Sequence, residues 1–203
     1  MTEEAQLNII DRTPLDMLAS RRSVLAARLV DPGPDEKELE RMLDVAVRVP
    51  DHGRVTPWRL QVLTRQAQKE LGDAFAEEFT RQNPGVPEDR LHLEWIRPQR
   101  SPVLVIVSSR IVPDREGVPP VEQLLSCGNV CFNLLHAATA LGYGAQWVTN
   151  WPAYNANIKE VLGIPPDDHL VGFVHIGTPK GPPQERQRPE MSEVVSHLDS
   201  LPD

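Results

Sequence analysis

Apolar and polar positions alternate along this chain with two different periods, which together predict a mixture of helices and strands. A spacing of three to four residues is typical of an amphipathic helix, and an alternation of two is typical of a half-buried strand. No internal repeat and no linker of different composition is visible, so residues 1–203 are predicted to form one α+β domain. The predicted helices begin near residue 13 and cover 35–49, 66–82, 88–97, 121–141 and 155–162, and the predicted strands cover 58–64, 103–108, 145–149 and 170–176.

The first two helices carry clear start signals. Pro14 suits the first turn of a helix, and Asp35 is a favoured N-cap residue after a Pro-Gly-Pro turn. The second helix must stop before Pro50, because proline disfavours helical backbone in the residue ahead of it. Residues 1–12 are polar and are expected to fray. The predicted apolar stripes are Leu15, Met17 and Leu18 in the first helix and Leu39, Leu43, Val45, Ala46 and Val47 in the second.

The centre of the chain is the most hydrophobic part. Residues 103–108 are a continuous apolar run ending in serine, which is typical of a strand buried on both faces. The helix at 121–141 is apolar most of the way round and is therefore predicted to be central. Residues 177–190 are rich in Pro, Gln and Arg and are not expected to form regular structure. An apolar helix and an extended tail both favour a homodimer with a large interface.

Composition narrows the class of partner. The formal net charge is −8, from 21 basic and 29 acidic side chains, which argues against a nucleic-acid surface but leaves room for a local phosphate site. The first thirty residues lack the apolar core of a secretory signal, and the apolar stretch at 130–143 is too short and too polar to span a bilayer. We therefore expect a soluble cytoplasmic protein without a membrane partner.

The two cysteines do not suggest a metal site. Cys127 and Cys131 lie four residues apart in the apolar helix, with no His/Cys pair to complete a zinc centre. Positions on adjacent helical turns also suit a disulfide badly. They are interpreted as small core residues, and no metal is predicted.

The sequence contains none of the common hydrolase, zinc-protease or nucleotide-binding motifs, but four groups of residues could bind a ligand. Adjacent arginines and a serine at a helix end offer donors for phosphate oxygens, although, taken alone, a solvated basic helix end is the more ordinary explanation. The other groups are an arginine and a histidine in a loop before Pro57 and Trp58, a helix closed by Gly142 ahead of a Trp-bearing strand, and two arginines in the tail. Taken singly, each has an ordinary structural explanation, such as a helix C-cap at Gly142.

The order of these groups resembles the nitroreductase family of FMN enzymes, and within it the compact bacterial branch. An Arg-Arg-Ser helix end is followed by Arg-x-Pro-Asp-His with Pro-Trp behind it. A long helix then ends in Gly-Tyr-Gly before a Trp-bearing strand, and the last strand ends in Ile-Gly-Thr-Pro. The resemblance spans residues 14–190. It implies a mixed, mainly antiparallel sheet flanked by helices, with FMN at the interface of a homodimer.

The resemblance also implies roles for named residues. Arg21, Arg22 and Ser23 would bind the phosphate, ribityl and pyrimidine side of FMN, and Arg48 and His52 would come from the facing subunit or from the same pocket. Arg186 or Arg188 would close over the phosphate. The residues implied to line the isoalloxazine are Ala137, Ala138, Thr139, Ala140, Leu141, Gly142, Trp147, Val148 and Thr149.

The implied activity is a ping-pong hydride transfer from NADH or NADPH, through FMN, to a nitroaromatic, a quinone or an activated double bond. The cofactor carries this chemistry, so no protein nucleophile or catalytic residue is predicted, and the proton could come from water or His52. Two alternatives stay open: a flavin enzyme that does not use nicotinamide, such as a dehydrogenase, a dehalogenase or a flavin-cleaving enzyme, and a flavin-binding module without turnover.

Overall fold

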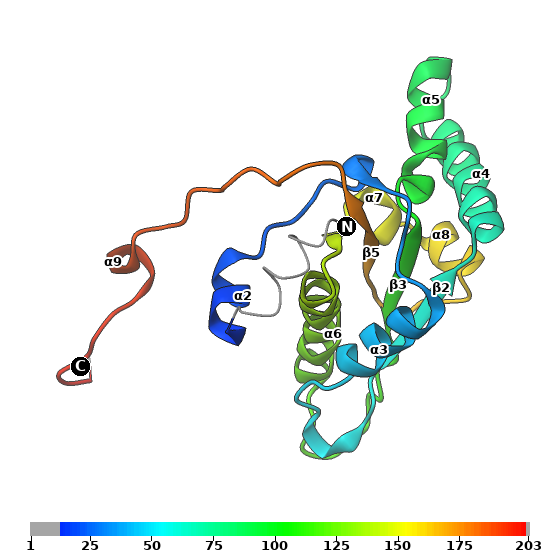
Figure 1. Cartoon of the computed structure of the whole chain (residues 1–203). Helices are drawn as coiled ribbons and strands as arrows, with labels where there is room; N and C mark the ends of the chain where they lie inside the picture. The colour runs from blue at the N-terminus through cyan, green and yellow to red at the C-terminus, as the bar shows by residue number, and fades with distance from the viewer. Residues whose placement is uncertain (1–12, 202–203) are drawn as a thin grey trace.

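The computed structural model describes residues 13–201 and is built on a five-stranded sheet (Figure 1). The strand order is β1-β5-β3-β2, with β4 also paired to β5, and every pair is antiparallel. This confirms the predicted mainly antiparallel sheet. The fraying predicted for residues 1–12 lies outside the described residues. The strands are β1 Leu29–Val30, β2 Trp58–Leu63, β3 Val103–Ser109, β4 Gly144–Val148 and β5 Leu170–Pro179.

Helices cover both faces of the sheet (Figure 1). Strand β3 shows this by alternation, because Val105 and Val107 pack with α3 and α6, whereas Leu104 and Ile106 pack with α4 and α8. All four side chains are fully buried, which confirms the prediction of a strand buried on two sides. The helices are α2 Pro14–Ser20, α3 Glu36–Ala46, α4 Arg65–Gln82, α5 Glu88–Trp95, α6 Pro120–Ala140, α7 Asn150–Ala153, α8 Ala156–Val161 and α9 Met191–Val194, with 3-10 turns η1 Ala26–Arg28, η2 His52–Arg54 and η3 Arg97–Gln99.

The predicted helix starts are confirmed by their caps. The Thr13 hydroxyl accepts a hydrogen bond from the backbone N–H of Asp16 at 3.2 Å, and the Asp35 carboxylate accepts one from Glu38 at 2.8 Å. In both cases the acidic side chain reaches back to the cap residue, which completes a capping box. Helix α6 ends as predicted, with Gly142 in the left-handed region at φ 84°.

Three expectations need correction. Strand β5 continues through residues 177–179, because these residues pair with β4 and β1. A Cβ at Gly177 would lie 2.5 Å from a Pro102 ring carbon, so this glycine permits the close approach. In α3, Met42 and Ala46 are buried, whereas Val45 and Val47 are exposed, because only one face of this helix meets α6. The short elements β1, α7 and α9 were not predicted.

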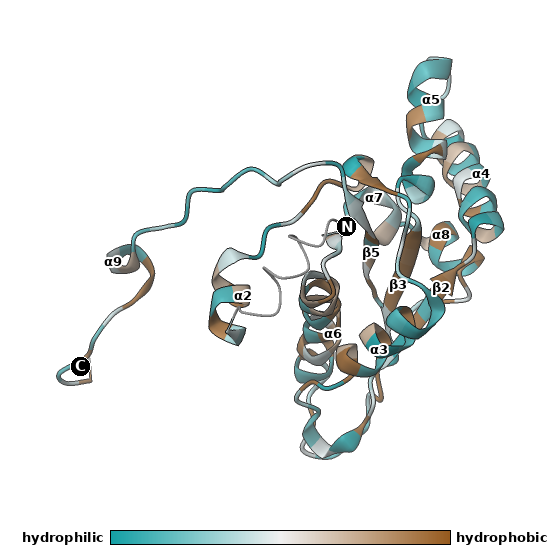
Figure 2. Ribbon diagram, in the orientation of Figure 1, coloured by the Kyte–Doolittle hydropathy of each residue, from teal (hydrophilic) through white to brown (hydrophobic). Residues whose placement is uncertain are grey.

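Helix α2 and the tail after β5 project from the same side of the body (Figure 1). No residue of α2 is buried, and Figure 2 shows hydrophobic segments both in α2 and around α9. Apolar side chains are exposed along α2, α6 and the tail, an amount typical of a surface that another molecule covers. The most exposed are Leu15, Val121, Leu125, Met191, Val194, Leu198 and Leu201.

Candidate functional site

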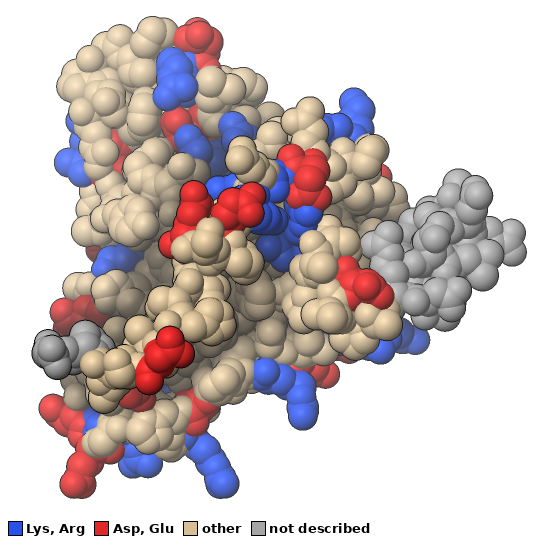
Figure 3. Space-filling model, turned by 90° about the vertical axis from the view of Figure 1, so that its left-hand side faces the viewer, with Lys and Arg blue, Asp and Glu red and all other residues tan. Residues whose placement is uncertain are grey.

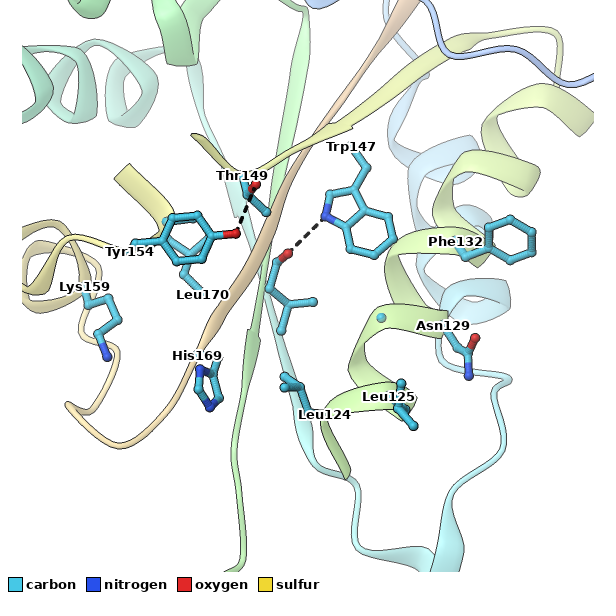
Figure 4. A pocket seen from close by; sticks show the side chains of 13 residues that line it. Leu124, Leu125, Asn129, Phe132, Trp147, Thr149, Tyr154, Lys159, His169 and Leu170 are labelled. Atoms are coloured by element: carbon cyan, nitrogen blue, oxygen red, sulfur yellow. Dashed lines mark hydrogen bonds between the residues drawn. The ribbon is translucent and has the colours of Figure 1, made fainter. Parts of the chain in front are cut away.

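A large pocket with a volume of about 790 Å³ lies between α6, β4, α7 and the start of β5 (Figure 4). Its walls are mainly apolar and aromatic, with a few polar groups at the rim, a composition typical of small-molecule sites. This volume is large enough for a cofactor with a tricyclic ring. The lining residues are Leu124, Leu125, Gly128, Asn129, Phe132, Trp147, Thr149, Ala153, Tyr154, Lys159, His169, Leu170 and Val171.

Two glycines position the Trp147 ring in this pocket. A Cβ built on Gly172 would lie 2.0 Å from Trp147 Nε1, so the indole rests directly on the backbone of β5. The ring is held there by a hydrogen bond from Nε1 to the carbonyl of Val171 at 3.0 Å. Gly128 of α6 faces the other edge of the ring at 3.8 Å, measured from its ideal Cβ. Trp147 is therefore fixed as a flat wall, with one face toward β5 and an edge toward α6.

The polar groups at the pocket rim differ in how many hydrogen bonds they already make within the chain. Lys159 Nζ donates to the carbonyls of Pro166 at 2.6 Å and Asp168 at 2.8 Å, so two of its three donors are used. Tyr154 is exposed at the mouth, with its hydroxyl 3.5 Å from Thr149 Oγ1 (Figure 4). His169 is exposed at the same rim.

A basic group lies beside this pocket, at the end of α2. Arg22 donates to Glu185 of the tail and to the carbonyls of Ala19 and Arg21, yet its buried Nε has no hydrogen-bond partner among the described atoms. Burial, and then the charges of Arg188 and Arg22, lower the pKa of Arg21. Figure 3 looks onto this side of the molecule, where blue and red side chains gather around the tail. An excess of positive charge with an orphan donor suits a phosphate group.

Phe132 connects the basic group to the pocket. The guanidinium carbon of Arg21 lies 6.0 Å from the centroid of the Phe132 ring, and Phe132 also lines the pocket. The Phe132 ring meets His136 edge-on at 4.2 Å between centroids. Burial, and then the charge of Arg21, lower the pKa of His136. The chain therefore offers a continuous surface with cationic groups at one end and aromatic walls at the other.

The residues at the end of α6 that were predicted to line the isoalloxazine do not line the large pocket. Ala137 and Ala138 are buried in the core between α3, α6 and the sheet, and the Thr139 hydroxyl donates to the Leu135 carbonyl of its own helix. Ala137, Ala140 and Leu141 border a second pocket of about 490 Å³ against α2 and α3. Of the predicted strand residues, Trp147 and Thr149 line the large pocket, whereas Val148 points to the other face of the sheet.

The two predicted loop residues, Arg48 and His52, lie at different levels along α6. His52 Nδ1 is 2.7 Å from Glu122 Oε2, whereas Arg21 is near His136. Glu122 and His136 are separated by roughly 21 Å along the helix axis, from a rise of 1.5 Å per residue. The Arg48 side chain is exposed near the middle of the helix, where its carbonyl accepts from Asn133. One chain therefore does not bring His52 to the basic group.

The outer residues of the predicted phosphate site are less enclosed. Ser23 is exposed immediately after Arg22, and Arg186 and Arg188 lie on the exposed tail. Of the two tail arginines, only Arg188 is close enough for its charge to lower the pKa of Arg21.

Sequence reasoning missed the wall that α6 contributes. Leu125, Gly128 and Phe132 follow one another at intervals of three and four residues, on the face opposite the buried Cys127, Val130 and Leu134. This second apolar stripe was the available signal, and it was hidden because the helix is apolar on nearly every side. Tyr154 and His169 gave no periodic signal.

The described residues also define what the structure does not contain. Within residues 13–201, no three His, Cys, Asp or Glu side chains gather closely enough to hold a metal ion. None of the helices in this range combines the length and hydropathy needed to cross a bilayer.

Known proteins resemble this chain in both sequence and fold. The model of the nitroreductase family matches residues 18–178. A Haemophilus influenzae protein named "Putative NAD(P)H nitroreductase" is 29% identical over 164 residues, covering 81% of this chain and 87% of the relative. A nitroreductase-like family protein of Bacillus cereus superposes with a TM-score of 0.80 at 21% identity, over 93% of this chain and 97% of the other. A Desulfovibrio desulfuricans structure described as "a putative nitroreductase in complex with fmn" superposes with a TM-score of 0.70 at 19% identity, over 92% of this chain and 98% of the other. The chain belongs to the nitroreductase family.

Proposed function

We propose that this protein is an FMN-dependent oxidoreductase that takes hydride from NADH or NADPH and reduces an electron-poor acceptor such as a nitroaromatic, a quinone or an activated double bond. The observation that carries the proposal is a continuous surface, in which the basic group at the end of α2 meets Phe132 through Arg21 and Phe132 lines the large pocket. This surface matches a ligand with a phosphate at one end and a flat ring at the other. When bound, FMN supplies the centre that accepts and donates hydride.

The residues present fit such a cofactor. The unpartnered Nε of Arg22 and the partly buried guanidinium of Arg21 would hold the phosphate, with the hydroxyl of Ser23 as a further donor. The carboxylate of Glu185, on the exposed tail, forms an ion pair with Arg22, so it would have to move away for the phosphate to bind there. The Trp147 ring and the α6 wall would exclude water from one side of the flat ring.

A homodimer would complete the site. The exposed apolar side chains of α2, α6 and the tail would be covered by a second copy, and a standard interface buries about 800 Å² on each partner. A two-fold axis would also let His52 of one copy approach the site of the other, which the distance along α6 prevents within a single chain.

Purification and spectroscopy test the proposal. The protein is expected to purify yellow, and anaerobic addition of NADH or NADPH is expected to bleach the flavin absorbance. Colourless protein that does not bind added FMN would contradict the proposal. An unchanged flavin spectrum with both nicotinamides would instead favour the flavin enzymes that do not use nicotinamide, or the binding module.

Variants of the basic group test the site. Arg21→Ala or Arg22→Ala is expected to weaken FMN binding about 10- to 150-fold, because each charge-assisted hydrogen bond contributes about 1.5–3 kcal/mol. Arg59→Ala is a matched control, because this exposed β2 arginine makes only a 3.4 Å contact with the carbonyl of Gly163. Unchanged FMN affinity in both Arg21→Ala and Arg22→Ala would overturn the assigned roles. Sedimentation showing a monomer that retains FMN would overturn the dimer.

A further inference from the structure

Another, smaller pocket lies behind β4, on the opposite face of the sheet from the large pocket of Figure 4. It has a volume of about 190 Å³ and is bordered by η3, the segment 25–27, β4 and β5. Gln146 and Val148 of β4 line it, whereas the alternating neighbours Trp147 and Thr149 line the large pocket. Its volume is below the range of sites that hold drug-sized ligands, about 300–1,000 Å³, so its ligand must be small.

The pocket has an excess of positive charge. Arg97 forms two 2.8 Å hydrogen bonds with the buried Glu94, which also accepts from Trp151 Nε1 at 2.9 Å. Arg90 is a third, more distant partner of Glu94 at 3.8 Å. Arg100 borders the same pocket and makes no hydrogen bond or ion pair with any described residue. Three arginines therefore surround a single carboxylate. Burial, and then the charge of Arg97, lower the pKa of Arg100, whereas the charge of Glu94, which already pairs with Arg97, raises it.

Gln146 adds neutral donors. Its Oε1 accepts a hydrogen bond from the backbone N–H of Ala26 at 2.6 Å, which fixes the orientation of the amide. Its Nε2 has no hydrogen-bond partner among the described residues, so both N–H groups are available to a ligand. The site thus combines a planar cationic fork with an amide donor, a combination suited to a small oxyanion.

His175 adds an acceptor, and its tautomer follows from the hydrogen bonds. Ser101 Oγ lies 2.7 Å from the Val103 carbonyl, which can only accept, so the one hydroxyl proton is donated there. The 2.8 Å contact between Ser101 Oγ and His175 Nδ1 must then run from the ring N–H to the hydroxyl oxygen. Burial lowers the pKa of His175 to about 3, so the ring is neutral and its Nε2 is an acceptor. No described residue donates to Nε2.

We propose that this pocket binds inorganic phosphate, with Arg100 and Gln146 donating to its charged oxygens and its P–O–H group donating to His175 Nε2. Phosphate retains at least one O–H near neutral pH, whereas sulfate has none, so the acceptor distinguishes two anions of similar size. The site is separate from the FMN phosphate site proposed at Arg21 and does not depend on it.

Calorimetric titration of the flavin-loaded protein with sodium phosphate and sodium sulfate, at equal ionic strength, tests the proposal. Saturable phosphate binding is expected at one site per chain, with sulfate binding at least about tenfold more weakly, since a neutral acceptor facing a sulfate oxygen leaves both without a donor. Equal affinity for the two anions would overturn the role of His175. Absence of saturable phosphate binding would overturn the site.

Matched variants separate this pocket from the rest of the molecule. Arg100→Gln is expected to weaken phosphate binding about ten- to hundredfold while FMN content and thermal stability stay unchanged, and Arg100→Lys is expected to recover part of the affinity. Arg59→Gln is the control on β2. Arg21→Ala must still bind phosphate, because this substitution affects only the proposed FMN site. Unchanged binding in Arg100→Gln, or loss of binding in Arg21→Ala, would overturn the assignment.

A spectroscopic readout reports on the hydrogen bond itself. In protein labelled with 15N-histidine, the Nε2 resonance of His175 is expected to show an unprotonated ring nitrogen and to shift when phosphate is added. The Nδ1 resonance is expected to remain that of a protonated nitrogen, because Ser101 accepts from it in either state. A His175 with the proton on Nε2 would contradict the assigned tautomer and the proposal with it.

Discussion

Replacing Gly172 by alanine is a direct test of how the Trp147 ring is positioned. The added methyl would lie 2.0 Å from Nε1 and 2.3 Å from Cδ1 of the indole. Ordinary carbon contacts are about 3.5–4.0 Å, so the ring must move by about 1.5 Å or more. That movement breaks the hydrogen bond from Nε1 to the Val171 carbonyl.

The expected loss of stability can be worked from these contacts. Overpacking a filled site costs about 1–3 kcal/mol, a figure that includes repacking of the neighbours. The lost hydrogen bond contributes about 0.5–1.5 kcal/mol of this. Trp147 is 36% exposed and can swing outward, and alanine is favoured over glycine in a strand by about 0.5–1 kcal/mol. Gly172→Ala is therefore expected to lower the free energy of unfolding by about 1–2 kcal/mol, or the melting temperature by about 2–8 °C.

Urea denaturation of four variants isolates the cause. In a Trp147→Ala background the clash is absent, so adding Gly172→Ala is expected to be neutral or slightly stabilising. Gly128→Ala, which adds a methyl 3.8 Å from the other edge of the same ring, is the matched control and is expected to stabilise the helix by about 0.5–1 kcal/mol. An equal cost of Gly172→Ala with and without Trp147 would refute the argument, because the strain would then lie in the strand.

Two further predictions concern buried groups outside the pocket. The pKa of the buried Glu78 is lowered mainly by a hydrogen bond from Arg81, and amide donors lower it further. The ionised carboxylate therefore stabilises the fold above pH ~4.5, and this stabilisation is lost as the pH falls. Glu78→Gln is expected to lower the free energy of unfolding by about 1.5–3 kcal/mol at pH 7 and to flatten the decline of the urea midpoint on acidification. The control Glu77→Gln, at an exposed position, is expected to show neither effect. Parallel pH profiles for wild type and Glu78→Gln would count against this role. Burial raises the pKa of Cys127 to about 12 and also raises that of Cys131. Both thiols are therefore expected to resist alkylation in the native protein at pH 8 and to react in urea. Mass spectrometry that shows either thiol modified in the native state would contradict this.

The elements that could be predicted from the sequence are those whose signal is local. The helix starts at Thr13 and Asp35 and the apolar run of β3 depend on neighbouring residues, and the structure confirms them. Strand β1 and the last part of β5 are different, because Leu29 and Val30 form a strand only through pairing with Pro179 and Thr178. Residues 177–179 have the composition of a turn. Such pairing joins segments about 150 residues apart, and no local periodicity reports it.

The pocket was only partly predictable for a related reason. Trp147 and Thr149 could be placed together, because alternate residues of a strand share a face. The α6 wall could not be separated from the core, since Phe132 and Leu125 have the same apolar character as the buried positions of that helix. Which apolar residues are buried depends on how much sheet lies beneath the helix, and a linear pattern does not contain that quantity.

The fold of one chain does not by itself explain the roles expected of the loop residues Arg48 and His52. Arg48 and His52 follow the Arg-Arg-Ser segment in the order the family resemblance leads one to expect, yet His52 contacts Glu122 at one end of α6 and Arg21 lies near the other. A rigid helix cannot shorten this separation, so either His52 serves another purpose or a second copy brings it to the site. In an antiparallel arrangement of two α6 helices, the first turns of one lie beside the last turns of the other, which would place His52 of one copy near Arg21 of its partner. We expect such an arrangement to cover the exposed apolar face of α6, and FMN affinity that depends on protein concentration would be its direct consequence.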